Sequence, residues 1–331
     1  MRAGSTAQQH KRRLLLAGIA GLATLRTARA AAPDSKGAVT FIVPAPLGVS
    51  ADRLGRVVAD ALSTILEVPV HVENVAGDGG VTGTNAIAAG ARDGTLLGLA
   101  VSSAIVGGRL LSRAAKFSPI DDFQWLAILG SFPNAMVVAA NSPHQTIEAW
   151  LGAAREAPVP WVYASVGTGS AGHLAGAYLR LEQRARLVHR AVESNEERYA
   201  LLVEGKVAAL FEGVPNATVQ APRLGHRIIA VTSNARIGTL PSVPSFGELW
   251  QRSFVVWLGL VAPKGLDNAA YVRFAAAVGV LVAEPRYADA MRAAGLTFTG
   301  LSGRASVAYV ESEFLRNAKL IATLNEEGQR N

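Results

Sequence analysis

The feature that most constrains the fold is a repeated succession of a short apolar strand, a turn of small residues and a helix. Apolar strands are predicted at 38–43, 68–72 and 96–101. The segments between them carry apolar residues at helical spacing, which predicts helices over 54–65 and 82–91. A β-α-β-α-β succession indicates a parallel sheet that is covered by helices.

A second unit of the same kind begins near Asn134. Its predicted strands lie at 135–140, 161–165, 187–189, 208–211 and 228–232, and its predicted helices over 146–155, 171–183 and 196–204. Thr146 is the expected N-cap of the first of these helices.

The tail after residue 250 departs from this pattern. Its segments are an apolar run at 254–262, a helix over 271–283, a hairpin-like stretch at 296–300 and a helix over 307–324. Because this tail has no sheet of its own, we expect it to pack back onto the first unit.

The predicted architecture is therefore α/β, with two lobes that each contain a mainly parallel sheet and flanking helices. Residues 33–134 with 251–331 form the first lobe, and 135–250 form the second. Ligands of open α/β sheets bind outside the carboxyl ends of the strands. Two such lobes facing each other predict a ligand cleft that closes by hinge motion.

The distribution of charge argues against a nucleic-acid partner. The chain has 32 basic and 25 acidic residues, a formal charge of +7. Six of the basic residues lie in the first 30 positions, which contain no Asp or Glu, so the remaining 26 basic residues nearly balance the acidic ones. The excess charge belongs to the leader and not to a binding surface.

That leader has the pattern of an export signal. Lys11-Arg12-Arg13 precedes an apolar run from Leu14 to Leu25, which is too short for a stable membrane span. Ala28-Arg29-Ala30 gives an A-x-A cleavage pattern, so 1–30 is expected to be removed, with cleavage after Ala32 as an alternative. The arginine pair is compatible with a twin-arginine or a Sec route, and a basic tail is the other interpretation. We expect a periplasmic location.

Several kinds of chemistry are not expected. The chain has no cysteine, which excludes disulfides, thiolate metal sites and a lipoprotein anchor. The histidines show no metal-ligand spacing, so neither a metal nor another cofactor is predicted. No G-x-S-x-G motif is present, and no catalytic residue is proposed.

The turns that should face the cleft are rich in small residues. They lie at 44–52, 74–83, 102–103 and 165–170. Glycine lets backbone amides approach a ligand, and a helix N-terminus adds unpaired N–H groups and partial positive charge. Each turn alone could be an ordinary tight turn, but together they favour a site for a small organic anion such as a carboxylate.

Five polar side chains near these turns are candidates for a role in the site. His173 could contact the ligand, or cap and pack at the start of its helix. His189 and Arg190 follow a strand, and Arg190 could grip a carboxylate or lie in solvent. We interpret Asp52 as orienting the first turn, because a bare carboxylate would repel an anion. Glu212 could accept a hydrogen bond from a ligand amine or hydroxyl, or pair with a basic residue across the cleft.

Six segments also carry a family resemblance, at 43–52, 73–83, 93–97, 163–175, 240–244 and 262–265. In order and spacing they resemble V-P-F-P-P-G-G-x-T-D, E-N-x-x-G-A-G-G-x-x-G, D-G-Y-T-L-L, Y-A-S-x-G-x-G-S-x-x-H-L-A, L-P-D-V-P and A-P-x-G. These motifs are typical of the Bug receptors, the periplasmic substrate-binding proteins of tripartite tricarboxylate transporters. The likeness extends over about 38–325.

The resemblance implies the type II-like fold of periplasmic binding proteins, no enzymatic activity, and amides of the first two turns around a ligand carboxylate. It implies a monomer that delivers ligand to a permease of a large and a small integral subunit. Presentation of the ligand to a membrane sensor kinase is the alternative. The candidate ligand-binding residues are Pro46, Leu47, Gly48, Val49, Ser50, Asp52, Asp78, Gly79, Gly80, Ser102, Ser103, Ser165, Gly167, Thr168, Ser170, His173, His189, Arg190 and Glu212.

The chain departs from the family pattern in its first turn. Ala45, Leu47 and Val49 replace the usual Phe, Pro and Gly, and V-P-Y-[KR]-G becomes 188–192 without its glycine. Glu212 stands where Asp is common. We therefore expect a reshaped pocket, whose ligand need not be a typical di- or tricarboxylate.

A dinucleotide-binding oxidoreductase is the remaining alternative. Residues 167–172 read G-x-G-x-x-G between a strand and a helix, with Glu193 at 21 residues beyond Gly172. This unit does not begin the βαβ series, and an exported protein has little access to NAD, so the interpretation is disfavoured.

Overall fold

The computed structural model describes residues 37–328, with side chains to residue 324. The predicted export signal over 1–30, with cleavage near Ala30, lies outside the described residues. No helix in the described part of the chain combines the length and the apolar character needed to cross a membrane.

Each of two sheets contains three parallel strands, as predicted. In the first sheet the order is β2 (Val70–Asn74), β1 (Val39–Val43) and β3 (Leu96–Val101). The second has β6 (Leu187–Ala191), β5 (Trp161–Ser165) and β7 (Ala209–Gly213). We call the parts of the chain built on these sheets the first and the second lobe.

Antiparallel strands complete both sheets. β9 (Val255–Pro263) lies between β3 and β4 (Phe123–Val138) and is antiparallel to both. β10 (Thr297–Ser302) pairs with β4 in the first sheet, and β8 (Arg227–Val231) pairs with it in the second. The segment 296–300 is therefore part of a single strand added to the sheet, and not a hairpin.

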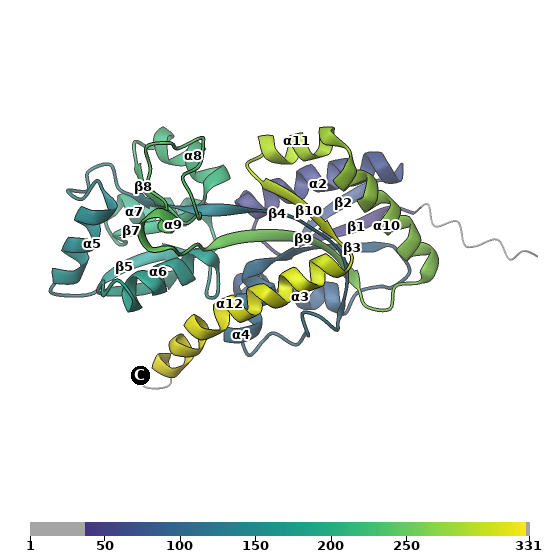
Figure 1. The fold of residues 1–331 in the computed structure, drawn as a ribbon, viewed down its shortest axis with the longest axis horizontal. Coiled ribbons are helices and arrows are strands. Elements are labelled where there is room, and N and C mark those ends of the chain that lie inside the picture. Colours follow the sequence, from purple (N-terminus) through teal and green to yellow (C-terminus); the bar gives the residue numbers. More distant parts are fainter. Residues whose placement is uncertain (1–36, 329–331) are drawn as a thin grey trace, which may run out of the picture. The chain divides into compact units, whose positions relative to one another are not determined.

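The 16-residue strand β4 belongs to both sheets (Figure 1). It pairs with β9 as far as Pro133 opposite Val255, and with β7 from Asn134 opposite Gly213. Gly130 and Pro133 interrupt its apolar pattern, which is why only its second half was predicted. The change of partner supports lobe boundaries near 134 and 250, which stay a prediction.

Helices cover both faces of the first sheet because alternate strand residues point to opposite faces. On one face α2 (Ser50–Leu66) packs on Val39, Phe41 and Val43, and on the other α3 (Val81–Ala88) packs on Ile42. The first face also holds α10 (Asn268–Ala283) and α11 (Pro285–Ala293), and the second holds η2 (Ser103–Gly108), α4 (Arg109–Leu111) and the first part of α12 (Arg304–Gly328).

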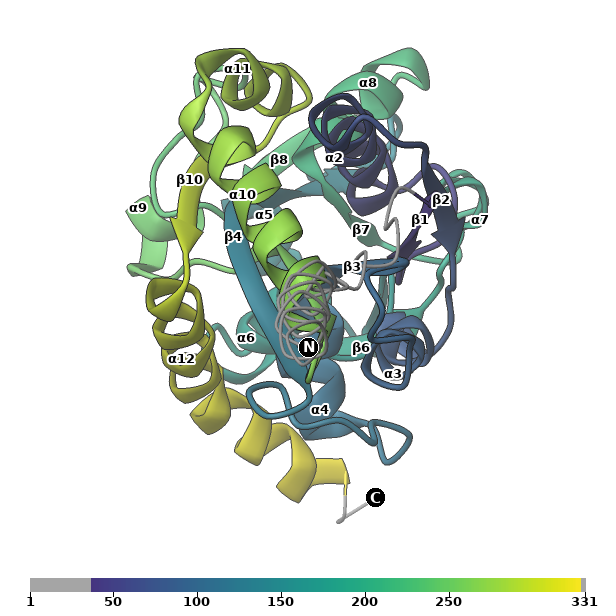
Figure 2. The same cartoon turned by 90° about the vertical axis from the view of Figure 1, so that its right-hand side faces the viewer.

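Figure 2 looks onto the first lobe, where α2 and α11 lie above the strands and α3 and α4 below them. The second sheet is covered in the same way. One face holds α5 (Ile147–Glu156), α6 (Ala171–Leu181) and α9 (Phe246–Trp250), and the other holds α7 (Asn195–Val203) and α8 (Val214–Arg223). The Thr146 hydroxyl accepts a hydrogen bond from the Ala149 amide at 3.2 Å, which confirms the predicted cap of α5. The helices α8, α9 and α11 were not predicted, because they are short or contain proline.

The last helix contacts the cores of both lobes. Val310 of α12 is buried in the first, whereas Ile321, three turns later, is buried against α6 in the second. The tail was expected to pack back onto the first unit, and the end of α12 packs on the second as well. Because α12 has 25 residues, it extends beyond the first sheet, and its last turns pack on apolar residues of the second lobe.

We predict that Phe274→Ala destabilises the protein by about 3–5 kcal/mol, the usual cost of deleting a core phenylalanine. Phe274 is fully buried on α10 beneath α2. On the same helix, Tyr271 is 40% exposed, so Tyr271→Ala should cost less than about 0.5 kcal/mol. Urea unfolding of both variants measures the difference, and equal costs would contradict the described packing of α10.

Candidate functional site

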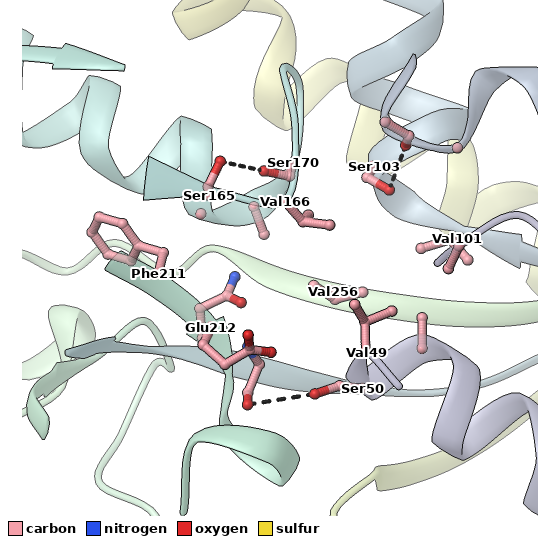
Figure 3. Close-up of a pocket in the computed structure, with 18 of the residues that line it drawn as sticks. Val49, Ser50, Val101, Ser103, Ser165, Val166, Ser170, Phe211, Glu212 and Val256 are labelled. Carbon is pink, nitrogen blue, oxygen red and sulfur yellow. Dashed lines mark hydrogen bonds between the residues drawn. The ribbon is translucent and has the colours of Figure 1, made fainter. Parts of the chain in front are cut away.

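A cavity lies between the turns of the two lobes (Figure 3). The space open to the centres of water-sized spheres is about 60 Å³, several times the ~10–15 Å³ that one water needs. The predicted residues that line it are Pro46, Val49, Ser50, Gly79, Gly80, Ser103, Ser165, Ser170 and Glu212. Both lobes therefore contribute to one site, at the edge where their parallel strands end.

The first turn is held in place by Asp52, which is 2% exposed. Its carboxylate accepts hydrogen bonds from the Gly48 amide at 2.9 Å and from Asn74 Nδ2 at 2.8 Å, and it pairs with Arg56 at 3.0 Å. Asp52 is thus engaged within the first lobe and does not line the cavity. Leu47 is 72% exposed and does not line the cavity.

The second turn depends on its glycines. Gly79 and Gly80 have φ of +65° and +98°, which disfavours any side chain. A Cβ on Gly80 would lie 2.7 Å from the Pro44 carbonyl oxygen, so the second turn packs directly on the first. Ser103, at the start of η2, donates to the Gly79 carbonyl at 3.2 Å. Asp78 is turned aside and hydrogen-bonds Ser112.

Two helices begin at this wall without a side-chain cap. The N-cap positions of α2 and α3 are Val49 and Gly80, and neither side chain accepts a hydrogen bond from the helix. The first N–H groups of α2 therefore stay available to an acceptor in the cavity, whereas at the start of α3 the amides of Val81 and Thr82 donate to the carbonyls of Asp78 and Gly77. The side chain of Val49, which replaces the usual glycine of the family, is 6% exposed and packs in the first-lobe core.

The opposite wall is formed by two serines of the second lobe. Ser165 Oγ and Ser170 Oγ are 3.1 Å apart, and Ser170 Oγ also donates to the Gly167 carbonyl at 2.7 Å. Ser170 accepts from the His173 amide at 3.2 Å, so it caps α6. The geometry explains why both hydroxyls are fixed at the cavity wall.

His173 and His189 stand behind these serines and do not line the cavity. Their rings are 4.2 Å apart between centroids. His189 Nε2 is 2.8 Å from Ser165 Oγ, and His173 Nδ1 accepts from the Gly169 amide at 3.0 Å. The two rings brace the turn that places Ser165 and Ser170 at the cavity wall.

Burial shifts both histidines in the same direction. Burial, with a smaller effect of His173, lowers the pKa of His189 to about 3. Burial, with a smaller effect of Arg180, lowers the pKa of His173 to about 4. Both rings are thus neutral at neutral pH. A ring with so low a pKa is a weak base toward Ser165, which does not favour nucleophilic catalysis.

A buried ion pair of the second lobe forms part of the cavity wall. Arg198 NH2 lies 2.6 Å from Glu212 Oε2, and the side chains are 1% and 3% exposed. Glu212 was expected either to face the ligand or to pair across the cleft, whereas its partner is in its own lobe. Arg198 was not singled out from the sequence, because the pattern of an amphipathic helix predicts that a lone arginine lies on the surface.

Apolar side chains make up most of the remaining lining. They are Val101, Phe132, Phe211 and Val256, from strands β3, β4, β7 and β9, together with Pro44, Ala45 and Val166. β4 and β9 were not recognised as cavity strands, because only the pairing of the two sheets brings them there. Asn134, at the change of partner in β4, also lines the cavity.

The other predicted residues lie around the cavity without lining it. Arg190 is 46% exposed and 4.0 Å from Glu197. Ser102 accepts from the Trp257 amide at 3.2 Å. Gly48, Gly167 and Thr168 lie at the contact between the lobes.

The lobes touch on both sides of the cavity. Asn195 Nδ2 donates to the Gly48 carbonyl at 3.2 Å, and Ser50 Oγ donates to the Gly213 carbonyl at 3.4 Å. On the other side, a Cβ on Gly79 would lie 3.0 Å from the Thr168 carbonyl oxygen, and one on Gly107 would overlap the Gly169 carbonyl. The G-x-G-x-x-G turn thus packs its backbone against the first lobe.

We predict that the protein loses stability as pH falls from about 6.5 toward 4, in part through the two histidines. Their folded pKa values lie below the ordinary value of 6.5, so in this range the unfolded chain binds protons that the folded chain does not. Urea unfolding at pH 7 and pH 4.5 should show a smaller loss for His189→Gln and His173→Gln than for the natural sequence. A loss of the same size in all three would contradict the burial of these rings.

Comparison with known proteins agrees with this geometry. Residues 54–326 match TctC, the tripartite tricarboxylate transporter family receptor. A relative, the UPF0065 protein in the tcbD-tcbE intergenic region of Pseudomonas sp. (strain P51), is 30% identical over 315 residues, 94% of each chain.

Two solved structures have the same fold. The periplasmic binding protein BugD gives a TM-score of 0.79 at 22% identity, over 88% of this chain and 98% of BugD. Rpa4515 of R. palustris, solved with adipate, gives a TM-score of 0.80 at 22% identity, over 86% of this chain and 96% of its own. The resemblance to the Bug receptors and the α/β periplasmic-binding-protein fold are confirmed. The chain belongs to the TctC family, the periplasmic receptors of tripartite tricarboxylate transporters, which are binding proteins and not enzymes.

Proposed function

We propose that this chain is a periplasmic receptor that captures a small organic anion through a carboxylate and delivers it to a membrane permease of a large and a small integral subunit. The observation that carries the proposal is the cavity between the lobes, at which α2 and α3 begin without side-chain caps. The N-terminus of α2 offers unpaired N–H groups to one carboxylate, and both helix starts offer partial positive charge.

The family and a ligand-bound relative support this proposal. Rpa4515, which shares the fold, was solved with adipate, a carboxylate. Asp52 does not oppose an anion, because its carboxylate is engaged by Gly48, Asn74 and Arg56.

Capture and release require the lobes to separate and close. The cavity is bounded by contacts between the lobes at Gly48, Ser50, Gly79 and Gly107. Hydrogen bonds and backbone packing hold these contacts, whereas the lobes are linked by β4, β9 and α12. We therefore assign hinge motion to β4 and β9, with opening at the glycine contacts.

A screen of small carboxylates against the chain without residues 1–30 tests the function. Thermal unfolding should shift upward with at least one of them, because a ligand at 100 times its Kd adds about 2.7 kcal/mol to stability. Neutral analogues in which an amide replaces the carboxylate serve as controls and should not shift the transition. If only neutral or cationic solutes stabilise the protein, the carboxylate assignment is wrong.

Closure is tested at Gly107. A Cβ there overlaps the Gly169 carbonyl of the other lobe, so Gly107→Ala should hinder closing without disturbing either core. Since bound ligand is enclosed only when the lobes meet, we expect an affinity at least about tenfold lower, equivalent to ~1.4 kcal/mol. Calorimetry with the carboxylate found in the screen gives this value.

Gly152→Ala is the matched control for that variant. Gly152 lies in α5, and an added Cβ meets nothing within 4 Å. This variant should bind as the natural sequence does and gain slightly in stability, because alanine is the better helix former. Unchanged affinity in Gly107→Ala would remove the glycine contact from the closing mechanism.

A further inference from the structure

We propose that the ligand of this receptor carries a single carboxylate and no second negative charge, so that the protein selects monocarboxylates over dicarboxylates of the same length. The inference rests on the proposed function, which supplies the carboxylate at the first two turns. It concerns the rest of the cavity, where the ligand's other end must lie.

The ionisable side chains that line the cavity do not favour a second anion. Among the described lining residues they are Glu193, Arg198 and Glu212, two acids and one base. A second carboxylate is normally held by a free arginine or lysine, which provides a charge-assisted and often bidentate contact. The single guanidinium in this cavity therefore decides whether such a contact is possible.

Arg198 is already engaged. Its NH2 group donates to Glu212 Oε2 at 2.6 Å and also contacts Asn195 Oδ1, and its NH1 group donates to the carbonyls of Val192 at 2.6 Å and Glu193 at 2.9 Å. Only Nε lacks a partner in the described part of the chain. The two NH groups with which an arginine binds a carboxylate therefore already donate to acceptors of the protein.

The charge of Arg198 is also neutralised. Glu212 Oε1 accepts from the Gly213 amide at 3.0 Å, so both carboxylate oxygens are held and the pair is fixed. At 1% and 3% exposure, the pair lies where charges interact strongly. A ligand near it meets a neutral pair and not a free cation.

Glu193 adds a negative charge to the same lining. No hydrogen bond or ion pair engages its carboxylate among the described contacts, although its carbonyl accepts from Arg198. The side chains of the cavity thus sum to one negative charge. This repels a second carboxylate and suits a ligand whose other end is apolar, hydroxylated or an amine.

The apolar wall fits the body of such a ligand. Phe132 and Phe211 face the cavity with Val101 and Val256, and each belongs to a different strand. Burial of aliphatic ligand atoms against this wall is favourable, at about 25 cal/mol per Å² of apolar surface. A dicarboxylate would place its second charge on the same surface without a counter-charge.

Matched ligand series test the inference by calorimetry. At each length from two to eight carbons, the straight-chain monocarboxylate, its ω-amino derivative and the α,ω-dicarboxylate are compared. We expect the tightest ligand to be a monocarboxylate or amino acid, with the dicarboxylate of that length at least about tenfold weaker. A dicarboxylate that binds as tightly overturns the inference and leaves the proposed function standing. If no carboxylate binds at any length, the proposed function fails and the inference fails with it.

Charge variants test the cause of the selectivity. Glu212→Gln should release the Arg198 charge, and Glu193→Gln should remove the unpaired one. Each is expected to improve dicarboxylate binding relative to monocarboxylate by about tenfold. Because Glu212 is buried, its variant is first checked for a cooperative melting transition. Should it not fold, Glu193→Gln alone decides.

Glu197→Gln is the matched control. Glu197 lies on α7 one residue from Arg198, but its side chain is 57% exposed and outside the cavity. It should leave the ratio of the two affinities unchanged. A ratio that does not move in Glu193→Gln, or moves equally in Glu197→Gln, contradicts a role for charge in the cavity.

Discussion

The fold depends on the continuous pairing of β4, which serves as a strand of both sheets. Its first half is bonded to β9 and β10, and its second half to β7 and β8. The parallel strands of each lobe are placed relative to β4, so their carboxyl ends and the turns that follow meet at one cavity. Without a shared strand, the two three-stranded units would be separate domains with no defined site between them.

The close contact between the two lobes requires glycine at several positions. Backbone meets backbone where Gly107 lies against Gly169 and where Gly79 lies against Gly167 and Thr168. The absence of Cβ at these positions lets the two backbones touch. The same small residues that suggested an anion site thus also form the contact between the lobes, and the G-x-G-x-x-G turn is part of that contact.

The buried Arg198–Glu212 pair sets the electrostatics of the cavity wall that the second lobe forms. Burial of two charges costs desolvation energy that their attraction offsets only with good geometry and further hydrogen bonds, both of which are present here. A guanidinium held by four acceptors is well placed to fix the α7 turn and poorly placed to grip an anion. In the function that we propose, the carboxylate therefore binds at the helix starts of the first lobe, and the second lobe provides the selectivity.

The sequence by itself determined the α/β class, the parallel strands, the glycine-rich turns and the resemblance to the receptor family. These features are local: strand and helix periods, caps such as Thr146 and the spacing of turn motifs are written in contiguous residues. Tertiary structure alone decided that β4 belongs to both sheets and that α12 reaches the core of the second lobe. It also decided that Phe132 and Phe211 line the cavity and that Arg198 forms an ion pair with Glu212. Each of these depends on contacts between residues distant in the chain, since a side chain's environment is set by what packs against it and not by its neighbours in sequence. Arg190 and Arg198 look alike in the sequence, and only the fold exposes one and buries the other.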